Sequence, residues 1–136
     1  KWGARINKLH VKSKLIKYKK HNYYFHSGIY YRKINNKYRI VRAPWGIRVN
    51  ILPKTATKIY VNWKPYYYYY GTFYMKIAGN SYETIKPPVG AKVEDLPEGL
   101  EEVKIDGETL YKLEDIYFKP ILDKEGKLEY EVINIE

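Results

Sequence analysis

Short stretches of alternating apolar and polar residues run along most of the chain, and glycine, proline and asparagine interrupt them. Val103–Asp106 and Thr109–Leu113 alternate on either side of Gly107, which is the pattern of a β-hairpin. Two further stretches, Tyr117–Leu122 and Leu128–Ile133, flank a turn-rich segment in the same way. β-Branched and aromatic residues dominate these stretches, so the pattern predicts antiparallel strands almost throughout.

The strand pattern recurs three times, with a period of 43 to 44 residues. Trp2–Leu9 matches Trp45–Leu52, and Val89–Leu96 opens a third copy. We therefore predict an all-β protein of antiparallel meanders, in which three tandem SH3-like or sandwich-like units share a core. A propeller is not expected, because three blades are too few. The whole chain, 1–136, should form one compact array, with repeat units at about 2–44, 45–88 and 89–136.

One segment, Lys8–Lys20, has the composition of a basic helix. It aligns, however, with Ile51–Trp63 of the second copy, where β-branched residues favour a strand. We therefore expect extended structure in this segment as well.

Charge is unevenly distributed among the copies. The chain has 25 Lys and Arg against 15 Asp and Glu, a net charge of +10. The first 82 residues contain 18 basic residues and no acid, whereas residues 83–136 contain 7 lysines and 15 acids. The basic end should attract polyanions, unless it is simply a solvated surface. The candidate basic face consists of Arg5, Lys8, Lys12, Lys14, Lys17, Lys19 and Lys20.

Tyrosine is the second unusual feature, with 17 of 136 residues. Five of them are consecutive, Tyr66–Tyr70, and must alternate between the two faces of a strand. Tyr67 aligns with Tyr24 and Tyr111 of the other copies, so we expect these three side chains to face the core.

The alternate positions of this run, Tyr66, Tyr68 and Tyr70, form the candidate aromatic face. Tyr68 aligns with Lys112 and Tyr70 with Glu114, and a buried charge without a partner would be unfavourable. We therefore predict that Tyr66, Tyr68 and Tyr70 point outward, where they could stack on sugars or bases. The alternative is purely structural, since cross-strand aromatic pairs also stabilise sheets.

Several spaced motifs carry a family resemblance: the segments Tyr66–Tyr74 and Tyr82–Pro97, with an echo in Gly28–Leu52. This pattern resembles a family of uncharacterised envelope proteins of bacteroidete-type bacteria that share a domain of unknown function. The resemblance implies an extracytoplasmic location, in the periplasm or at the cell surface, with an export signal removed before Lys1. It implies no catalytic residues. The third copy departs from the pattern because Asp115 replaces the turn glycine.

Catalytic and metal motifs are missing from the sequence. There is no cysteine, no G-x-S-x-G segment and no glycine-rich phosphate loop. The three histidines, His10, His21 and His26, lie in the stretch without carboxylates and lack the spacing of a zinc site. No apolar stretch is long enough to span a membrane. We expect no enzyme activity, no metal and no cofactor.

The sequence thus predicts a non-catalytic extracytoplasmic module that is structural or binds a glycan, a protein or an anionic polymer. The alternative is a nucleic-acid-binding protein that uses the basic first repeat and the aromatic strand. A third partner is another copy of the same chain, because the basic and acidic copies attract one another.

Overall fold

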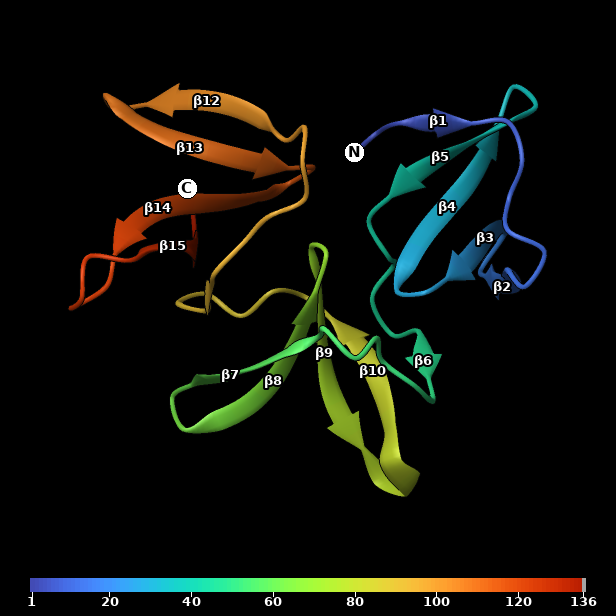
Figure 1. The fold of residues 1–136 in the computed structure, drawn as a ribbon, viewed down its shortest axis with the longest axis horizontal. Coiled ribbons are helices and arrows are strands. Elements are labelled where there is room, and N and C mark those ends of the chain that lie inside the picture. The colour runs from blue at the N-terminus through green and yellow to red at the C-terminus, as the bar shows by residue number, and fades with distance from the viewer. Residues whose placement is uncertain (136) are drawn as a thin grey trace.

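The computed structural model describes residues 1–135 and consists of three five-stranded antiparallel sheets (Figure 1). Each sheet is built from the strands of one repeat, so the predicted all-β architecture of three tandem copies is confirmed. The described residues contain no α-helix and only one short 3-10 turn, η1 (Ala78–Asn80). No helix in this part of the chain is long and apolar enough to cross a membrane.

The three sheets have the same topology, in which the short first strand pairs with the last. Sheet 1 has the order β1-β5-β4-β3-β2, and sheets 2 and 3 repeat it. Sheet 1 comprises β1 (Arg5–Ile6), β2 (Lys14–Tyr18), β3 (His21–His26), β4 (Ile29–Ile34) and β5 (Lys37–Val41). Sheet 2 comprises β6 (Arg48–Val49), β7 (Thr57–Val61), β8 (Lys64–Tyr69), β9 (Thr72–Ile77) and β10 (Ser81–Ile85). Sheet 3 comprises β11 (Lys92–Val93), β12 (Glu101–Ile105), β13 (Glu108–Leu113), β14 (Ile116–Leu122) and β15 (Leu128–Ile133).

The central hairpin of each sheet turns on two residues. Ser27 and Gly28 have φ angles of 47° and 83°, and Tyr70 and Gly71 have 45° and 86°. Positive φ at both central residues is the geometry that matches the twist of a hairpin. The third turn differs, since Glu114 has a φ of 57° but the following Asp115 lies outside the left-handed region.

The core lies between neighbouring sheets, and each sheet has two faces that differ in what covers them. We call the face that carries Tyr74 in sheet 2 the front face, and the face that carries Phe73 the back face. The aligned residues in the other sheets are Tyr31 and Tyr30 in sheet 1, and Phe118 and Tyr117 in sheet 3.

Two apolar clusters join neighbouring sheets. The back face of sheet 1 packs on the front face of sheet 2, through a cluster of Tyr30, Ala43, Ile47, Val49 and Tyr74. The back face of sheet 2 packs on the front face of sheet 3, through Tyr68, Phe73, Ala91, Val93, Leu113, Ile116, Phe118 and Val132. Sheet 2 is therefore covered on both faces.

Polar contacts connect the first and third repeats. The backbone N–H of Trp2 donates to the carbonyl of Glu98 at 2.6 Å. Arg42, which follows β5, pairs with Glu114 at 3.7 Å and with Asp115 at 3.5 Å. These contacts bring the acidic turn of sheet 3 beside the end of sheet 1, as the arrangement around the centre of Figure 1 shows.

Candidate binding surfaces

The predicted aromatic face does not exist as a continuous outward row. Tyr68 is only 3% exposed and belongs to the core between sheets 2 and 3, where its ring lies 4.9 Å from that of Phe73. Its hydroxyl donates to the carbonyl of Asp95 at 2.9 Å, and burial raises the pKa of Tyr68. The prediction that Tyr68 points outward is wrong.

The reason lies in the position of sheet 2 within the stack. Lys112, the residue of the third copy that aligns with Tyr68, lies on the back face of sheet 3, which no following repeat covers. The lysine therefore keeps its charge near solvent, whereas the same position in sheet 2 faces an apolar neighbour. Aligned positions have different surroundings because the repeats occupy different places in the stack.

The other two members of the predicted row are half-buried. Tyr70 lies in the β8–β9 turn, with its ring centroid 6.3 Å from that of Trp2. Burial and the nearby carboxylate of Glu98 raise the pKa of Tyr70. Together with Tyr68 it lines a pocket of about 260 Å³ whose rim includes Asp95 and Glu98. This tyrosine thus lies between Trp2 of the first repeat and the acidic side chains of the third, while Tyr66 lies on β8.

Tyr67 lies on the opposite side of β8 from Tyr68 and pairs with a second tyrosine, and a pair of this kind recurs in every repeat. In each repeat a tyrosine of the aromatic strand contacts a tyrosine of the closing strand, edge to face. The ring centroids are 5.4 Å apart in Tyr24–Tyr38, 5.2 Å in Tyr67–Tyr82 and 5.8 Å in Tyr111–Tyr130. Tyr67 and Tyr111 pack against the two apolar clusters, as predicted, but all three remain half-buried. These pairs account for much of the tyrosine content by packing alone.

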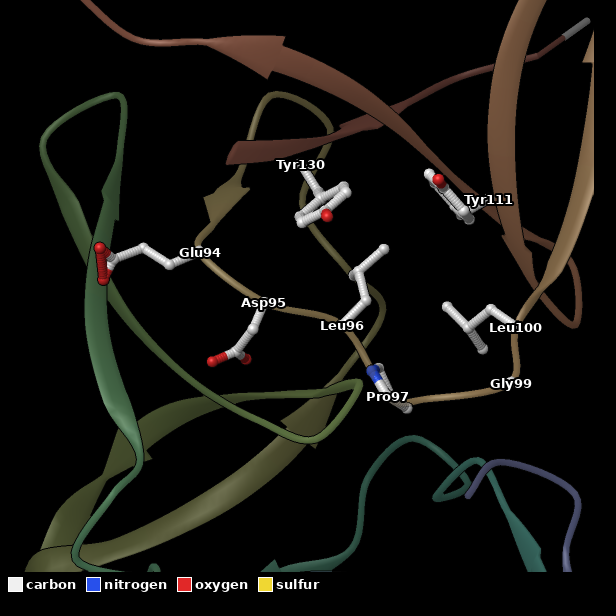
Figure 2. A pocket seen from close by; sticks show the side chains of 8 residues that line it. All are labelled: Glu94, Asp95, Leu96, Pro97, Gly99, Leu100, Tyr111 and Tyr130. Carbon is white, nitrogen blue, oxygen red and sulfur yellow. The ribbon is translucent and has the colours of Figure 1, made fainter. Parts of the chain in front are cut away.

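A pocket of about 290 Å³ lies beside the third tyrosine pair (Figure 2). Leu96 and Leu100 lie near Tyr111 and Tyr130, while Glu94 and Asp95 lie on its rim. The second repeat forms a similar pocket beside Tyr67 and Tyr82, at Leu52 and Pro53. Since the loop with the Leu-Pro pair supplies one wall in both repeats, these hollows are consequences of the repeat architecture.

All seven residues of the predicted basic face are exposed, and none forms an ion pair among residues 1–135. They do not share one face of the sheet. Lys14 and Lys17 lie on edge strand β2 with opposite parity, and Lys19 and Lys20 form the turn that follows. The structure therefore surrounds the β2 edge with positive charge.

A groove of about 270 Å³ lies where β2 of sheet 1 meets β6 of sheet 2. Lys14 and Arg48 contribute cationic side chains to its lining. Two of its apolar residues are well exposed, Leu15 at 51% and Ile51 at 79%. No sequence pattern marks Leu15, Arg48 or Ile51 as members of a site, because β2 and β6 belong to different sheets and meet only when the sheets stack.

The histidines lie apart from any carboxylate cluster. The rings of His10 and His26 stack at a centroid distance of 4.0 Å, and the Arg32 guanidinium donates to Nδ1 of His21 at 3.2 Å. Within the part of the chain that the structure describes, no three potential metal ligands gather into a site.

Comparison with known proteins gives one match. The sequence model of DUF6515, described as a family of unknown function, matches residues 1–136. Neither the curated proteins nor the solved structures contain a match to the chain. Because the match extends over the whole chain, the protein belongs to the DUF6515 family of unknown function.

Proposed function

We propose that this chain is a non-catalytic binding module of the bacterial cell envelope that binds an anionic polymer through its first repeat. The observation that carries the proposal is the groove between β2 and β6, together with the unpaired cations around it. Residues 1–44 contain 13 Lys and Arg and no acid, and the basic residues on β2 and the following turn are exposed.

Long-range attraction and short-range contact have separate sources in this surface. The acid-free repeat produces a positive potential that draws polyanions toward it and weakens as salt is added. In the groove, the Lys14 ammonium and the Arg48 guanidinium can hold a carboxylate, sulfate or phosphate. Leu15 and Ile51 offer an apolar contact for the polymer backbone. Arg48 also pairs with Glu83 at 3.1 Å, so a ligand would share or displace that partner.

The burial of Tyr68 weighs against the two ligands that need stacking. A neutral glycan and a single-stranded nucleic acid both use a row of accessible aromatic rings, and this row is interrupted in its middle. A nucleic acid could still bind through its phosphates alone, which makes it the second candidate. The envelope location rests on the motif resemblance, and fractionation of cells that express the natural gene tests it.

Binding of the purified chain to polyphosphate, polyglutamate, polygalacturonate and single-stranded DNA, titrated with salt, tests the proposal. We expect salt-sensitive binding of the non-nucleic polyanions, and a several-fold loss in Lys14→Gln/Lys17→Gln. The matched control is Lys104→Gln/Lys124→Gln, which removes two exposed charges from repeat 3 and should leave binding almost unchanged. Equal losses in both variants, or no binding at physiological salt, would overturn the proposal. Binding of DNA alone would favour the second candidate.

A further inference from the structure

The two interfaces between neighbouring sheets bring aligned aromatic residues together in the same way. Tyr30 on the back face of sheet 1 contacts Tyr74 on the front face of sheet 2, with 3.0 Å between their hydroxyl oxygens. Phe73 and Phe118 are the aligned pair between sheets 2 and 3, and their rings stack at 6.5 Å with an interplanar angle of 14°. In both cases a back-face aromatic residue meets the front-face aromatic residue of the next repeat.

Two of the six aligned aromatic residues do not belong to such a pair, and one of them lies at each end of the stack. The front face of sheet 1 presents Tyr31 and the back face of sheet 3 presents Tyr117; both are half-buried, whereas Tyr30, Phe73, Tyr74 and Phe118 are at most 1% exposed. Tyr31 and Tyr117 make no ring contact with each other. Neither apolar cluster includes a strand residue from the front face of sheet 1 or from the back face of sheet 3, and we call these two faces the head and the tail.

The first hairpin turn packs closely on the repeat that follows it. A side chain in place of Gly28 would meet Tyr69 and Pro53 of the next repeat within 2.7 Å, so that turn is tightly seated.

The aligned receiving position in repeat 1 holds the stacked rings of His10 and His26. His10 is exposed and His26 is half-buried, and no turn of a preceding repeat covers them. The head therefore carries the surface that, in repeats 2 and 3, contacts the hairpin turn of the repeat before it.

The two ends carry opposite charge. Residues 1–44 have 13 basic residues and no acid, while residues 89–136 have 14 acids and 6 lysines. On the head face, Lys17 and Lys33 share the parity of Tyr31. On the tail face, four glutamates and three lysines share the parity of Tyr117; these are Glu101, Glu108, Glu129, Glu131, Lys92, Lys112 and Lys119. The charges of the repeats therefore favour contact of a head with a tail over contact of two heads or two tails.

We propose that the tail of one chain packs on the head of a second copy, with Tyr117 against Tyr31, and so continues the stacking that joins the repeats within each chain. Such a contact is heterologous, and it leads to open chains of molecules or to closed rings. Because the contact joins residues 1–44, with a net charge of +13, to residues 89–136, with a net charge of −8, it weakens when salt screens the charges.

Sedimentation of the full chain over a range of concentrations tests self-association. We expect the average mass to rise above the 16.3 kDa of one chain as concentration increases, and to fall again in high salt. A mass that stays at one chain under all these conditions overturns the proposal. This result would leave polyanion binding untouched, so the two proposals fail separately.

Mixing of two variants tests the head-to-tail geometry. Tyr31→Glu blocks the head, Tyr117→Lys blocks the tail, and each variant alone should remain monomeric. Equimolar mixing should restore a heterodimer of twice the monomer mass and nothing larger, since one intact tail meets one intact head. If either variant alone dimerises, the contact is symmetric and the proposal is wrong.

A folding control accompanies this experiment. Circular dichroism and thermal unfolding show whether each variant keeps its β-structure. Lys33→Glu, at an exposed position on the head face, is the second head variant and needs no repacking. It should weaken self-association. Lys33→Glu/Tyr117→Lys should pair with the intact tail of Tyr31→Glu less tightly than Tyr117→Lys does, and unchanged pairing contradicts a contact at this face.

Discussion

The hydroxyl groups of Tyr30 and Tyr74 lie 3.0 Å apart in the interface between sheets 1 and 2. Tyr30 is 1% exposed and Tyr74 is fully buried, so each hydroxyl satisfies the other where water has no access. The pair links two neighbouring repeats by a directional bond in an otherwise apolar cluster. It therefore helps to fix how one repeat sits on the next.

Removal of one hydroxyl should destabilise the protein more than removal of both. Tyr74→Phe leaves the Tyr30 hydroxyl buried without a partner, and we expect a loss of about 1–3 kcal/mol in the free energy of unfolding. The double variant should lose less than the sum of the single variants. Urea unfolding of the four proteins measures this coupling. Tyr66→Phe, at a half-buried position, is the control and should change stability little; strictly additive losses would contradict the pairing.

Stability should fall at alkaline pH because of the same tyrosines. Burial raises the pKa of Tyr30 to about 12 and raises the pKa of Tyr74 and of Tyr68 as well. Since each folded-state pKa lies above the unfolded value of 10.0, the stabilisation is complete below pH 10 and is lost as pH rises from 10 through 12. Unfolding free energies measured from pH 8 upward check this. Tyr30→Phe/Tyr74→Phe should show a shallower decline, and an equally steep one would refute the assignment.

Gly28 should tolerate a side chain less well than Gly46 does. Both have positive φ, 83° and 95°, so alanine at either position carries backbone strain of roughly 1–2 kcal/mol. At Gly28 the added Cβ would also lie 2.5 Å from the Tyr69 ring, whereas nothing lies within 4 Å at Gly46. We expect Gly28→Ala to reduce the unfolding free energy clearly more than Gly46→Ala in urea titrations. Similar losses would mean that the turn is not seated against the next repeat.

Arg42 should contribute more to stability than Arg48 does. The Arg42 side chain is 22% exposed, pairs with Glu114 and Asp115, and has its guanidinium 4.5 Å from the centre of the Trp45 ring. The Arg48 side chain is 73% exposed and has one partner, Glu83. We expect Arg42→Gln to cost about 1 kcal/mol and Arg48→Gln less, because solvent screens exposed pairs. Thermal unfolding at low and high salt compares them, and a larger effect of Arg48→Gln would be evidence against this ranking.

The all-β architecture of antiparallel meanders could be predicted from the sequence because it depends on local chemistry, whereas the pairing of each short first strand with the last strand of its sheet was not predicted. Alternation fixes which residues share a face, and Gly28 and Gly71 permit the positive φ angles that close the hairpins. The repetition of these signals every 43 to 44 residues predicted three equal units. Asp115 shows that the signal is not indispensable, since the third hairpin forms without glycine.

The surroundings of each face could not be predicted in the same way. Alignment with Lys112 implied that Tyr68 is exposed, but the two positions differ in what covers them. The groove at Lys14 and Arg48 was missed for a related reason, since its walls come from different sheets.

The sequence by itself determined the strands, the three-fold repetition and the separation of charge, because these follow from side-chain type and spacing along the chain. Only the tertiary structure decided which faces are buried, because burial depends on which repeat lies against which. Sheet 2 packs on another sheet at both of its faces, whereas sheets 1 and 3 each pack on sheet 2 at one face. Tyr68 is therefore a core residue of sheet 2. The aligned Lys112 lies on the back face of sheet 3, outside both apolar clusters, and keeps its charge near solvent.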